Sequence, residues 1–389
     1  MHILICPNAF KNSLSAREAA NAIQHGLSKS NLEFTSECFP IADGGDGTAA
    51  LITELSGGKF IETTVHDPLG RRIKAQYGLI HKGTTAVIDM ASASGLKLHD
   101  PSELNPMQAS SIGTGELITD ALDKGIRKIL IGMGGTATVD GGCGILESLG
   151  VKFFNAQNQV IKPVPENLLT LSRIDTTNLD SRIKDCECIL ICDVTNYLLG
   201  RKGAARIFGP QKGASKKTVL MLEKAMSQFN LVAQKTTSIN LNKLPGGGAA
   251  GGAAAGVTTF LNAKSVKGAN YFLSLTNFDR ALEKADVVIT GEGSIDLQTL
   301  SGKGPYAVAI KAYNSKIPVI ALAGKVPITN NVKIQKYFPV LLSIGNEPTD
   351  YTTAIQNTKI NLERISLQIG NFLHQGSSKK LTLIRNASR

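Results

Sequence analysis

The sequence lacks long apolar runs and has few cysteines and histidines. No run of about 18 apolar residues, the length of a membrane-spanning helix, is present, and the N-terminus has no signal-peptide layout. We therefore expect a cytoplasmic protein with no membrane partner. Among the six cysteines only Cys186 and Cys188 lie close together, without the second pair or histidine cluster of a zinc site. The six histidines are scattered outside any motif, so histidine chemistry is not favoured.

Several signatures of catalytic and binding loops are also missing. The sequence contains no G-x-x-x-x-G-K-[ST] P-loop, no protein-kinase motif set, no G-x-S-x-G elbow and no H-E-x-x-H pair. The acidic loop "IADGGDGT" lacks the twelve-residue ligand pattern of a calcium-binding EF-hand. These absences exclude P-loop nucleotide binding, protein phosphorylation, serine-elbow hydrolysis, zinc proteolysis and EF-hand calcium binding.

The formal net charge of +11 is not distributed like that of a nucleic-acid binder. Lys379, Lys380, Arg385 and Arg389 lie at the C-terminus, in a stretch without acids that we expect to be a solvated tail. Elsewhere basic and acidic residues alternate, and no segment interleaves basic residues with aromatic ones as a base-stacking surface does. We expect no nucleic-acid partner, and the basic balance suits an enzyme with an anionic substrate.

Apolar, β-rich runs alternate with helical patterns at both ends of the chain, which predicts an α/β fold with parallel strands. The run at 2–7 is followed by a helix whose capping box is Ser15 and Glu18. A second strand is expected at 34–40. The pattern returns from about residue 286 with "DVVITGEG", "IPVIALAG" and "PVLLSIGN". Together these five strands predict a flavodoxin-like parallel sheet.

The middle of the chain has a different pattern. "KFIETTVHDPLGRRIKAQYGLI" predicts two extended segments around a turn, and "KILIGMGG" and "CILICDVTN" predict buried strands. "LPGGGAAGGAAAG" is either a flexible linker or a tight loop leading into a closely packed helix, and the alanines between its glycines favour the loop. The predicted fold is α/β with two α/β domains. A discontinuous flavodoxin-like parallel-sheet domain spans 1–62 and 280–375, an inserted mixed-sheet α/β domain spans 63–279, and a basic tail spans 376–389.

Glycine-rich or polar loops follow several of these strands, where open α/β sheets collect their ligands. The first loop exposes Lys11, and "IADGGDGT" supplies Asp43. "IGMGGTATVDGG" offers backbone N–H groups and the hydroxyls of Thr136 and Thr138 to phosphate oxygens. Its G-x-G-x-x-A spacing also matches the dinucleotide fingerprint, but the turn at 139–142 interrupts the expected helix. A purely structural turn is the other interpretation of this loop.

Two further loops carry candidate catalytic groups. Asp193 lies just past an apolar strand, where a carboxylate binds Mg²⁺ or takes a proton from a substrate hydroxyl, and Lys212 lies downstream. In "ITGEGSIDLQTLSGKGP", Glu292 and Asp296 follow a buried strand, and Lys303 precedes a helix. A lysine at a helix N-terminus contacts phosphate well because its charge and the free N–H groups converge. Turn formers and exposed charges are the alternative interpretation of these residues.

Taken together, these loops resemble the type I glycerate kinases of bacteria from residue 1 to about 370. The resemblance rests on "PNAFKNSLSA", "IADGGDGT", "DPLGR", "DMASASGL", "IGTGELI", "IGMGGTATVDGG", "CDVTNYLLG", "FGPQKGA", "GGGAAGG" and "ITGEGSIDLQTLSGKGP", all in order. It implies two α/β domains with a site in the cleft between them. It also implies phosphorylation of D-glycerate by ATP with Mg²⁺, with 2-phosphoglycerate as the usual product. We expect a monomer or a homodimer.

From the loops and the resemblance we assign roles. The catalytic candidates are Asp193 as the base, with Lys11 and Lys303 on phosphate or on the substrate carboxylate. Glu292 and Asp296 are the Mg²⁺ candidates, and the roles of these two acids and Asp193 are interchangeable. The predicted substrate- and phosphate-binding residues are Asn8, Ser13, Asp43, Lys212, Gly134, Gly135, Thr136, Thr138, Asp140, Gly141 and Gly142.

The sequence departs from the family pattern at several motif positions. Asn8 replaces an aspartate, Asn12 a glycine, Val139 an asparagine, Tyr197 a proline and Ser294 an arginine. Loss of one carboxylate and one arginine suggests that the residues at 8 and 294 replace a former ion pair. The alternatives are a kinase retuned to another small hydroxy acid, and a weakened homologue that binds glycerate or nucleotide without turnover. An NAD-dependent hydroxy-acid oxidoreductase is the rival from another enzyme class.

Overall fold

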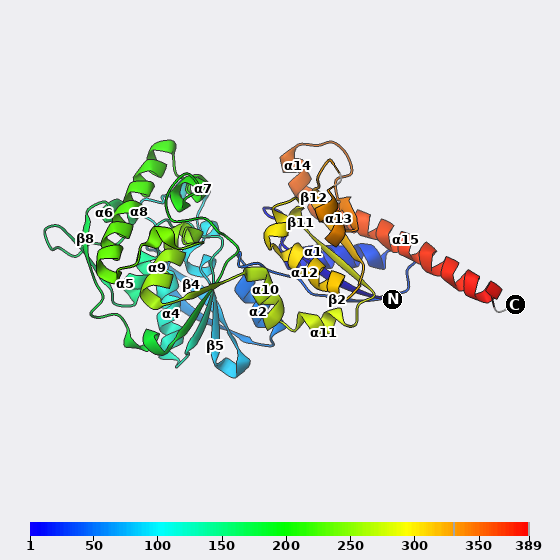
Figure 1. Ribbon diagram of the computed structural model, residues 1–389, viewed down its shortest axis with the longest axis horizontal. Coiled ribbons are helices and arrows are strands. Elements are labelled where there is room, and N and C mark those ends of the chain that lie inside the picture. The colour runs from blue at the N-terminus through cyan, green and yellow to red at the C-terminus, as the bar shows by residue number, and fades with distance from the viewer. Residues whose placement is uncertain (330, 388–389) are drawn as a thin grey trace. The chain divides into compact units, whose positions relative to one another are not determined.

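The computed structural model describes residues 1–329 and 331–387, with the side chains of 301 and 377–387 outside the description. The chain forms two compact units (Figure 1). The first unit consists of Met1–Asp43 and Gly268–Arg389, and the second unit of Gly44–Lys267. No helix in the described part of the chain combines the length and apolar character needed to cross a bilayer.

The first unit contains a five-stranded parallel sheet in the order β13-β12-β11-β1-β2. This confirms the predicted flavodoxin-like sheet. The chain moves outward in one direction from β1 to β2 and in the other from β11 to β13, so the strand order reverses between β1 and β11. The strands are β1 His2–Pro7, β2 Thr35–Cys38, β11 Val287–Ser294, β12 Val319–Lys325 and β13 Val340–Ser343.

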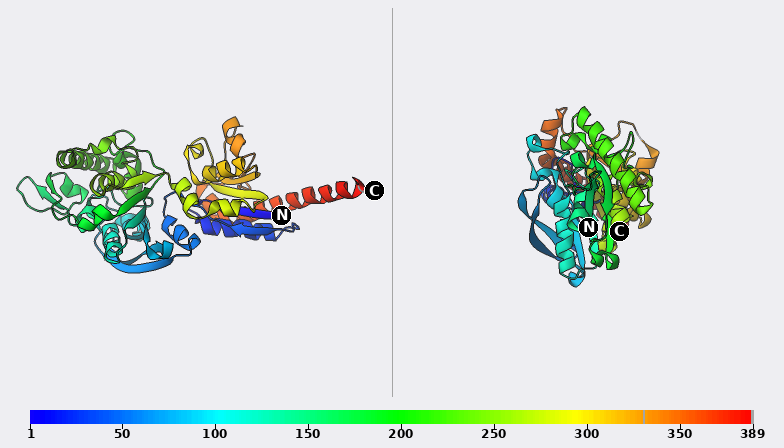
Figure 2. Two further views of the ribbon diagram at one scale, coloured as in Figure 1. Left: turned by 60° about the horizontal axis from the view of Figure 1, so that its bottom comes forward. Right: turned by 90° about the vertical axis from the view of Figure 1, so that its left-hand side faces the viewer.

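Helices cover this sheet in two groups. Helix α1 (Ala16–Ser28) begins with the predicted capping box, in which Ser15 Oγ accepts from Glu18 N and the Glu18 carboxylate accepts from Ser15 N. It packs against α15 (Thr358–Ala387), and α12 (Gly304–Asn314) packs against α10 and α13 (Figure 2). The other helices of the unit are α10 Gly268–Leu275, α11 Phe278–Leu282, α13 Val332–Tyr337 and α14 Tyr351–Gln356.

The C-terminal prediction needs correction. A solvated basic tail was expected over 376–389, but α15 continues to Ala387. Residues 377–387 contain neither proline nor glycine, so no residue in this stretch breaks the helical pattern. The side chains of Lys379, Lys380 and Arg385, and the whole of Arg389, lie outside the described residues.

The second unit contains a mixed six-stranded sheet in the order β10-β9-β6-β5-β4-β3. β3 and β4 form the antiparallel pair predicted around the turn at 67–70, and β5, β6, β9 and β10 are parallel. β7 and β8 form a separate antiparallel pair, which the sequence did not predict. The strands are β3 Lys59–His66, β4 Arg72–Ile80, β5 Thr85–Asp89, β6 Lys128–Gly132, β7 Lys152–Asn155, β8 Leu171–Asp175, β9 Glu187–Ile191 and β10 Lys264–Val266.

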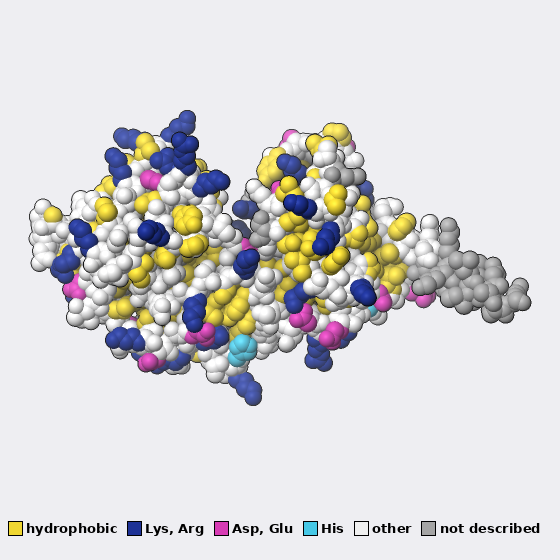
Figure 3. Space-filling view, in the orientation of Figure 1, with side chains coloured by type: hydrophobic (Ala, Val, Ile, Leu, Met, Phe, Trp, Pro, Cys, Tyr) yellow, Lys and Arg dark blue, Asp and Glu magenta, His cyan; other side chains and the backbone are white. Residues whose placement is uncertain are grey.

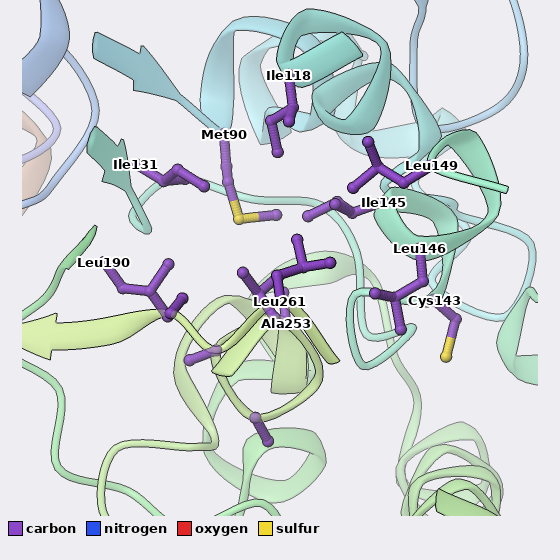
Figure 4. Close-up of a cluster of buried hydrophobic side chains, with 14 of the residues drawn as sticks. Met90, Ile118, Ile131, Cys143, Ile145, Leu146, Leu149, Leu190, Ala253 and Leu261 are labelled. Carbon is purple, nitrogen blue, oxygen red and sulfur yellow. The ribbon is translucent and has the colours of Figure 1, made fainter. Parts of the chain in front are cut away.

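Apolar packing anchors the second unit's glycine-rich loop at both ends. Ile131 precedes the loop and Cys143 follows it, and both are fully buried. Figure 4 shows Ile145 beside Met90 and Ile118 in this core. The α-helices of the unit are α2 Thr48–Leu55, α3 Ala91–Ser94, α4 Ile112–Asp123, α5 Cys143–Ser148, α6 Pro165–Leu168, α7 Ala204–Phe208, α8 Lys216–Thr237 and α9 Ala253–Leu261.

Both boundaries between the two units lie earlier in the chain than the predicted domain boundaries of 62/63 and 279/280. The divisions fall after Asp43 and after Lys267. Helix α2 belongs to the second unit because it packs against β4 and β5, and α10 belongs to the first unit because it packs against α12. Which sheet each helix covers depends on packing between distant parts of the chain, so the sequence pattern does not determine it.

The alanine- and glycine-rich segment is an ordered loop leading into a helix, as predicted. A 3₁₀ turn at Ala249–Gly252 leads directly into α9. Gly251 has φ +66°, and a Cβ atom there would lie 2.0 Å from the carbonyl oxygen of Thr138. Gly251 O also accepts from Gly141 N at 3.1 Å. Glycine is required here because the segment packs directly against the backbone of the 132–142 loop.

Candidate functional site

The carboxyl edge of the first unit's sheet holds one cluster of predicted residues. Asn8 follows β1 and lies beside β11, because its N–H donates to Gly291 O at 2.8 Å. Glu292 is the next residue of β11, and Lys303 is the N-cap residue of α12. These groups therefore lie where the strand order reverses, the position at which open α/β sheets bind their ligands.

Asn8 fixes Asp43 within this cluster. Its Nδ2 donates to Asp43 Oδ2 at 2.9 Å, and its Oδ1 accepts from Ala9 N at 2.8 Å. An aspartate at position 8 would place a second carboxylate against Asp43, so the asparagine removes a like-charge contact. Ser294 instead lines a cavity, and no hydrogen bond joins it to Asn8 in the described part of the chain. The hypothesis of a replaced ion pair between these positions gains no support.

Glu292 is the buried acid of the cluster, with only 7% of its surface exposed. Its Oε1 accepts from Thr299 Oγ1 at 3.0 Å, and its Oε2 lies 3.7 Å from Lys303 Nζ. Burial raises the pKa of Glu292 to about 7. Lys303 and Thr299 oppose that shift, whereas the Asp43 and Asp296 carboxylates add to it. Three acids therefore repel one another here, and Lys303 neutralises only part of their charge.

The predicted metal pair is not arranged as a closed metal site. Asp296 Oδ1 accepts from Gln298 N at 2.8 Å and Thr299 N at 3.3 Å, which holds the turn after β11. In residues 1–329 and 331–387 no group of three or more His, Cys, Asp or Glu side chains is placed to hold an ion. Glu292 and Asp296 as Mg²⁺ ligands stay a prediction.

The first loop presents Lys11 to solvent and is held by its neighbours. Lys11 is exposed and makes no hydrogen bond or ion pair within the described residues. Ser13 Oγ donates to Ile355 O at 2.7 Å, so this hydroxyl ties the loop to α14. Asn12 has φ +66°, a conformation that glycine adopts freely and asparagine tolerates. The departure at position 12 therefore preserves the shape of the loop.

A cavity of about 350 Å³ adjoins this cluster at the ends of β11 and β12. Ile295 and Ile334, both buried, contribute to its apolar lining. Asp296, Lys325 and Asn331 supply polar groups. An apolar cavity with a few convergent polar groups is the usual form of a small-molecule subsite.

The second unit has its own cluster of loops at the carboxyl ends of β5, β6 and β9. The 44–47 loop and the 132–135 loop approach backbone to backbone, with Gly134 N donating to Gly44 O at 2.9 Å. A Cβ atom on Gly134 would lie 2.5 Å from Gly45 Cα, so no larger residue fits. The glycines of the two motifs are therefore needed for contact between the loops as well as for turn conformation.

Asp89, at the end of β5, is a residue of this cluster that the sequence reasoning missed. Its carboxylate accepts from Gly47 N at 2.9 Å and from Ala49 N at 3.1 Å, so it caps the N-terminus of α2. The sequence did contain a signal for this residue, because Asp89 is an acid at the end of the apolar run "TTAVID". Burial raises the pKa of Asp89 to about 7, opposed by the hydrogen bond from Ala49.

This pKa predicts how Asp89 changes stability with pH. The folded state holds the proton more tightly than the unfolded chain, whose aspartate titrates near 3.8. The free energy of unfolding should thus fall between about pH 4 and 7, by at most about 4 kcal/mol. We expect Asp89→Asn to remove this slope in urea unfolding, whereas exposed Asp185→Asn keeps it. An unfolding free energy difference from wild type that stays constant with pH would contradict the assignment.

Lys212 is buried, with 2% of its surface exposed, and holds the glycine-rich loop from within. Its Nζ donates to Thr136 Oγ1 at 2.9 Å and to Thr138 O at 2.6 Å. Burial lowers the pKa of Lys212 to about 7, opposed by the nearby Asp140 carboxylate. Lys212 therefore acts on the shape of the loop. Thr138 Oγ1 is buried and has no hydrogen-bond partner among the described residues.

Asp140 organises the same loop from its other end. Its carboxylate accepts from Ser111 N and Ser111 Oγ, both at 2.7 Å, and from Gly142 N and Gly144 N. It thereby joins the beginnings of α4 and α5, and its oxygens are fully used inside the protein. Gly141 and Gly142 take positive φ, and α5 starts only at Cys143. The helix that a dinucleotide fingerprint needs after Gly134 is absent, which weighs against the oxidoreductase alternative.

Asp193 is half-buried two residues beyond β9, at the same edge as the glycine-rich loop that follows β6. The basic residues after it divide into two groups. Lys212 is internal, whereas the others are exposed and gather over α7 and the start of α8 (Figure 3). The exposed group is Arg201, Lys202, Arg206, Lys216 and Lys217.

The predicted residues thus form one cluster in each unit. Asn8, Asp43, Glu292, Asp296 and Lys303 belong to the first, and Gly134, Gly135, Thr136, Thr138, Asp140, Gly141, Gly142 and Lys212 to the second. The family model described as "Glycerate kinase family" matches residues 3–374.

The chain belongs to the glycerate kinase family. It is 39% identical to the glycerate kinase of Bacillus subtilis, over 95% of this chain and 97% of that protein. It is 40% identical to the glycerate 2-kinase of Escherichia coli, over 92% of this chain and 95% of that protein. A crystal structure described as that of a glycerate kinase 2 from Salmonella typhimurium LT2 is similar, with TM-score 0.79 and 37% identity over 97% of this chain and 99% of that one.

Proposed function

We propose that this protein transfers the γ-phosphoryl group of ATP to the 2-hydroxyl of D-glycerate, giving 2-phosphoglycerate. The observation that carries the proposal is membership of the glycerate kinase family over nearly the whole chain, with 40% identity to a glycerate 2-kinase. The clusters of lysines, acids and glycine-rich backbone at the carboxyl edges of both sheets support it, since phosphoryl transfer needs positioning and charge neutralisation more than covalent chemistry.

In this proposal Lys11 and Lys303 of the first unit bind anions. Lys11 is free to bind a phosphate or the glycerate carboxylate, because it has no partner within the described residues. Lys303 stands at the N-terminus of α12 and lies 3.7 Å from Glu292. Its ammonium group and the positive end of the α12 dipole both attract a phosphate. Ser13, with its hydroxyl bonded to Ile355, positions the loop that carries Lys11.

The 134–142 loop of the second unit is the proposed phosphate-binding loop, through N–H groups other than those of Gly134, Gly141 and Gly142, which donate to Gly44, Gly251 and Asp140. Lys212 and Asp140 fix it from opposite ends, so it needs little reorganisation on binding. Thr138 Oγ1 carries an unused donor in this loop. Asp193 is the proposed base that takes the proton of the substrate hydroxyl. Lys212 was predicted from sequence to bind phosphate, and in this proposal it instead positions the loop.

The donor set of the first unit suits a magnesium ion that arrives with the nucleotide. Mg²⁺ binds through one or two carboxylates plus phosphate oxygens and water. The repulsion among Glu292, Asp296 and Asp43 would be relieved by such a cation. When bound, the ion neutralises charge on the transferring phosphoryl group. The adjoining 350 Å³ cavity is large enough to take part of the nucleoside.

The deciding test is identification of the product of D-glycerate, ATP and Mg²⁺ by ³¹P and ¹H NMR. We expect 2-phosphoglycerate, and kcat/KM larger for D-glycerate than for tartronate or lactate. A preference for another acid would support the retuned kinase. Binding of glycerate or nucleotide without ADP release would support the weakened homologue, and thermal stabilisation by NAD but not by ATP would support the oxidoreductase.

The proposal also includes the partners, the cellular compartment and the oligomeric state. D-glycerate and ATP are the proposed partners, with no nucleic acid and no membrane, in a cytoplasmic monomer or homodimer. All six cysteines are free thiols, which suits a reducing compartment.

A further inference from the structure

Two cysteines outside the proposed kinase site lie next to each other at the amino end of β9. Cys186 follows the 3₁₀ turn at Ser181–Asp185, and Cys188 is the second residue of β9. The Cys188 thiol donates to Cys186 Sγ, with the two sulfur atoms 3.9 Å apart. Residues two apart in an extended chain point to the same side, so the backbone holds the thiols together.

The two thiols differ in access and acidity. Cys188 is 2% exposed and belongs to the apolar core of the second unit, whereas Cys186 is half-buried. The hydrogen bond from Cys188 lowers the pKa of Cys186, and the Arg127 guanidinium acts in the same direction. The pKa of Cys188 is raised by that same hydrogen bond and by burial. Burial opposes the lowering of the Cys186 pKa. A half-buried thiol next to a second thiol that can resolve a sulfenic acid is the arrangement found at redox-active sites.

The other cysteines with altered acidity lack this combination. Burial raises the pKa of Cys6 and of Cys143, both of which are fully enclosed. Burial also raises the pKa of Cys38, which donates to a backbone oxygen of α1. These thiols stay protonated and react slowly with oxidants.

We propose that Cys186 and Cys188 form a reversible oxidation site, in which a hydroperoxide oxidises Cys186 and Cys188 then closes a C-x-C disulfide. In the first step the Cys186 thiolate attacks a peroxide oxygen and the O–O bond breaks. The leaving oxygen takes a proton and departs as water or an alcohol, while Cys186 becomes a sulfenic acid.

In the second step Cys188 sulfur attacks Cys186 Sγ. The S–O bond breaks, the S–S bond forms, and the hydroxide leaves as water with the proton of Cys188. One hydroperoxide is reduced and two thiols are oxidised, so atoms and electrons balance. Closure needs the sulfurs to move from 3.9 Å to about 2.05 Å apart, the length of a disulfide bond.

The test uses the full-length protein with hydrogen peroxide, followed by trypsin digestion without reductant. Lys184 and Arg201 are the trypsin sites on either side of one peptide that holds Cys186, Cys188 and Cys192. We expect this peptide to lose two hydrogen atoms and to regain them with dithiothreitol. Fragment ions from cleavage between Cys188 and Cys192 place the bond. An unchanged peptide, or a bond to Cys192, would overturn the proposal.

Three variants separate the roles of the thiols. Cys188→Ser should accumulate a sulfenic acid at Cys186 that dimedone traps, because the resolving thiol is gone. Cys186→Ser should abolish the loss of hydrogen from the peptide, and Cys192→Ser, the control in the same peptide, should keep it. Oxidation of Cys188 that persists in Cys186→Ser would refute the order of the steps. None of these readouts depends on kinase activity.

Discussion

Asp193→Asn is expected to lower kcat for D-glycerate phosphorylation by about 10²–10⁴-fold, the range that a general base contributes. Asparagine keeps the size of the side chain but cannot accept the hydroxyl proton. Because Asp193 is proposed to act on the reacting hydroxyl, KM for ATP should change little. Steady-state kinetics with ADP release as the readout measures both quantities.

Asp185→Asn is the matched control for this variant. Asp185 is exposed and precedes β9, whereas Asp193 follows it, so the two acids lie at opposite ends of one strand. We expect wild-type kinetics from the control. Thermal unfolding of both variants checks that the second unit stays folded. If Asp193→Asn retained near-normal kcat in a folded protein, Asp193 would not be the base.

Lys11→Ala is expected to reduce transition-state stabilisation by about 2–4 kcal/mol, in the range of a lost charge-stabilising donor. The free energy of unfolding should stay unchanged, because the side chain is exposed and makes no hydrogen bond or ion pair within the described residues. Lys11→Arg should recover part of the activity by restoring the charge. The ratio of kcat/KM values for wild type and variant gives the loss directly.

Lys284→Ala is the control within the same unit. Lys284 is an exposed lysine just before β11, so it lies at the amino edge of the sheet that carries Lys11 at its carboxyl edge. A loss of positive charge alone should leave kcat/KM unchanged there. Equal losses in the two variants would mean that overall charge, and not a contact at position 11, attracts the substrate.

Much of the first unit could be predicted from sequence because its signals are local. The apolar run ending at Pro7, the capping box at Ser15 and the three late strands each define an element within a few residues. Glycine-rich loops after those strands then indicated the carboxyl edge of the sheet, which is where open α/β sheets bind their ligands. The assignment of Lys303 to a helix N-terminus followed in the same way.

The roles of individual polar side chains could not be predicted, because they depend on which groups meet from distant parts of the chain. Lys212 was expected to bind phosphate, yet it is buried against Thr136 and Thr138. Asp140 was grouped with the binding residues, yet Ser111 and two glycine N–H groups occupy its carboxylate. Asp89 was not singled out at all, because nothing near it in sequence shows that it caps α2.

The sequence by itself determined the strand and helix order, the flavodoxin-like sheet and the family, because periodicity, caps and motif spacing are read over short windows. Only the tertiary structure decided which charged groups are available to a ligand and which hold the protein together. Burial and pairing are properties of the folded chain: Lys11 and Lys212 are the same residue type, yet one is exposed whereas the other is enclosed.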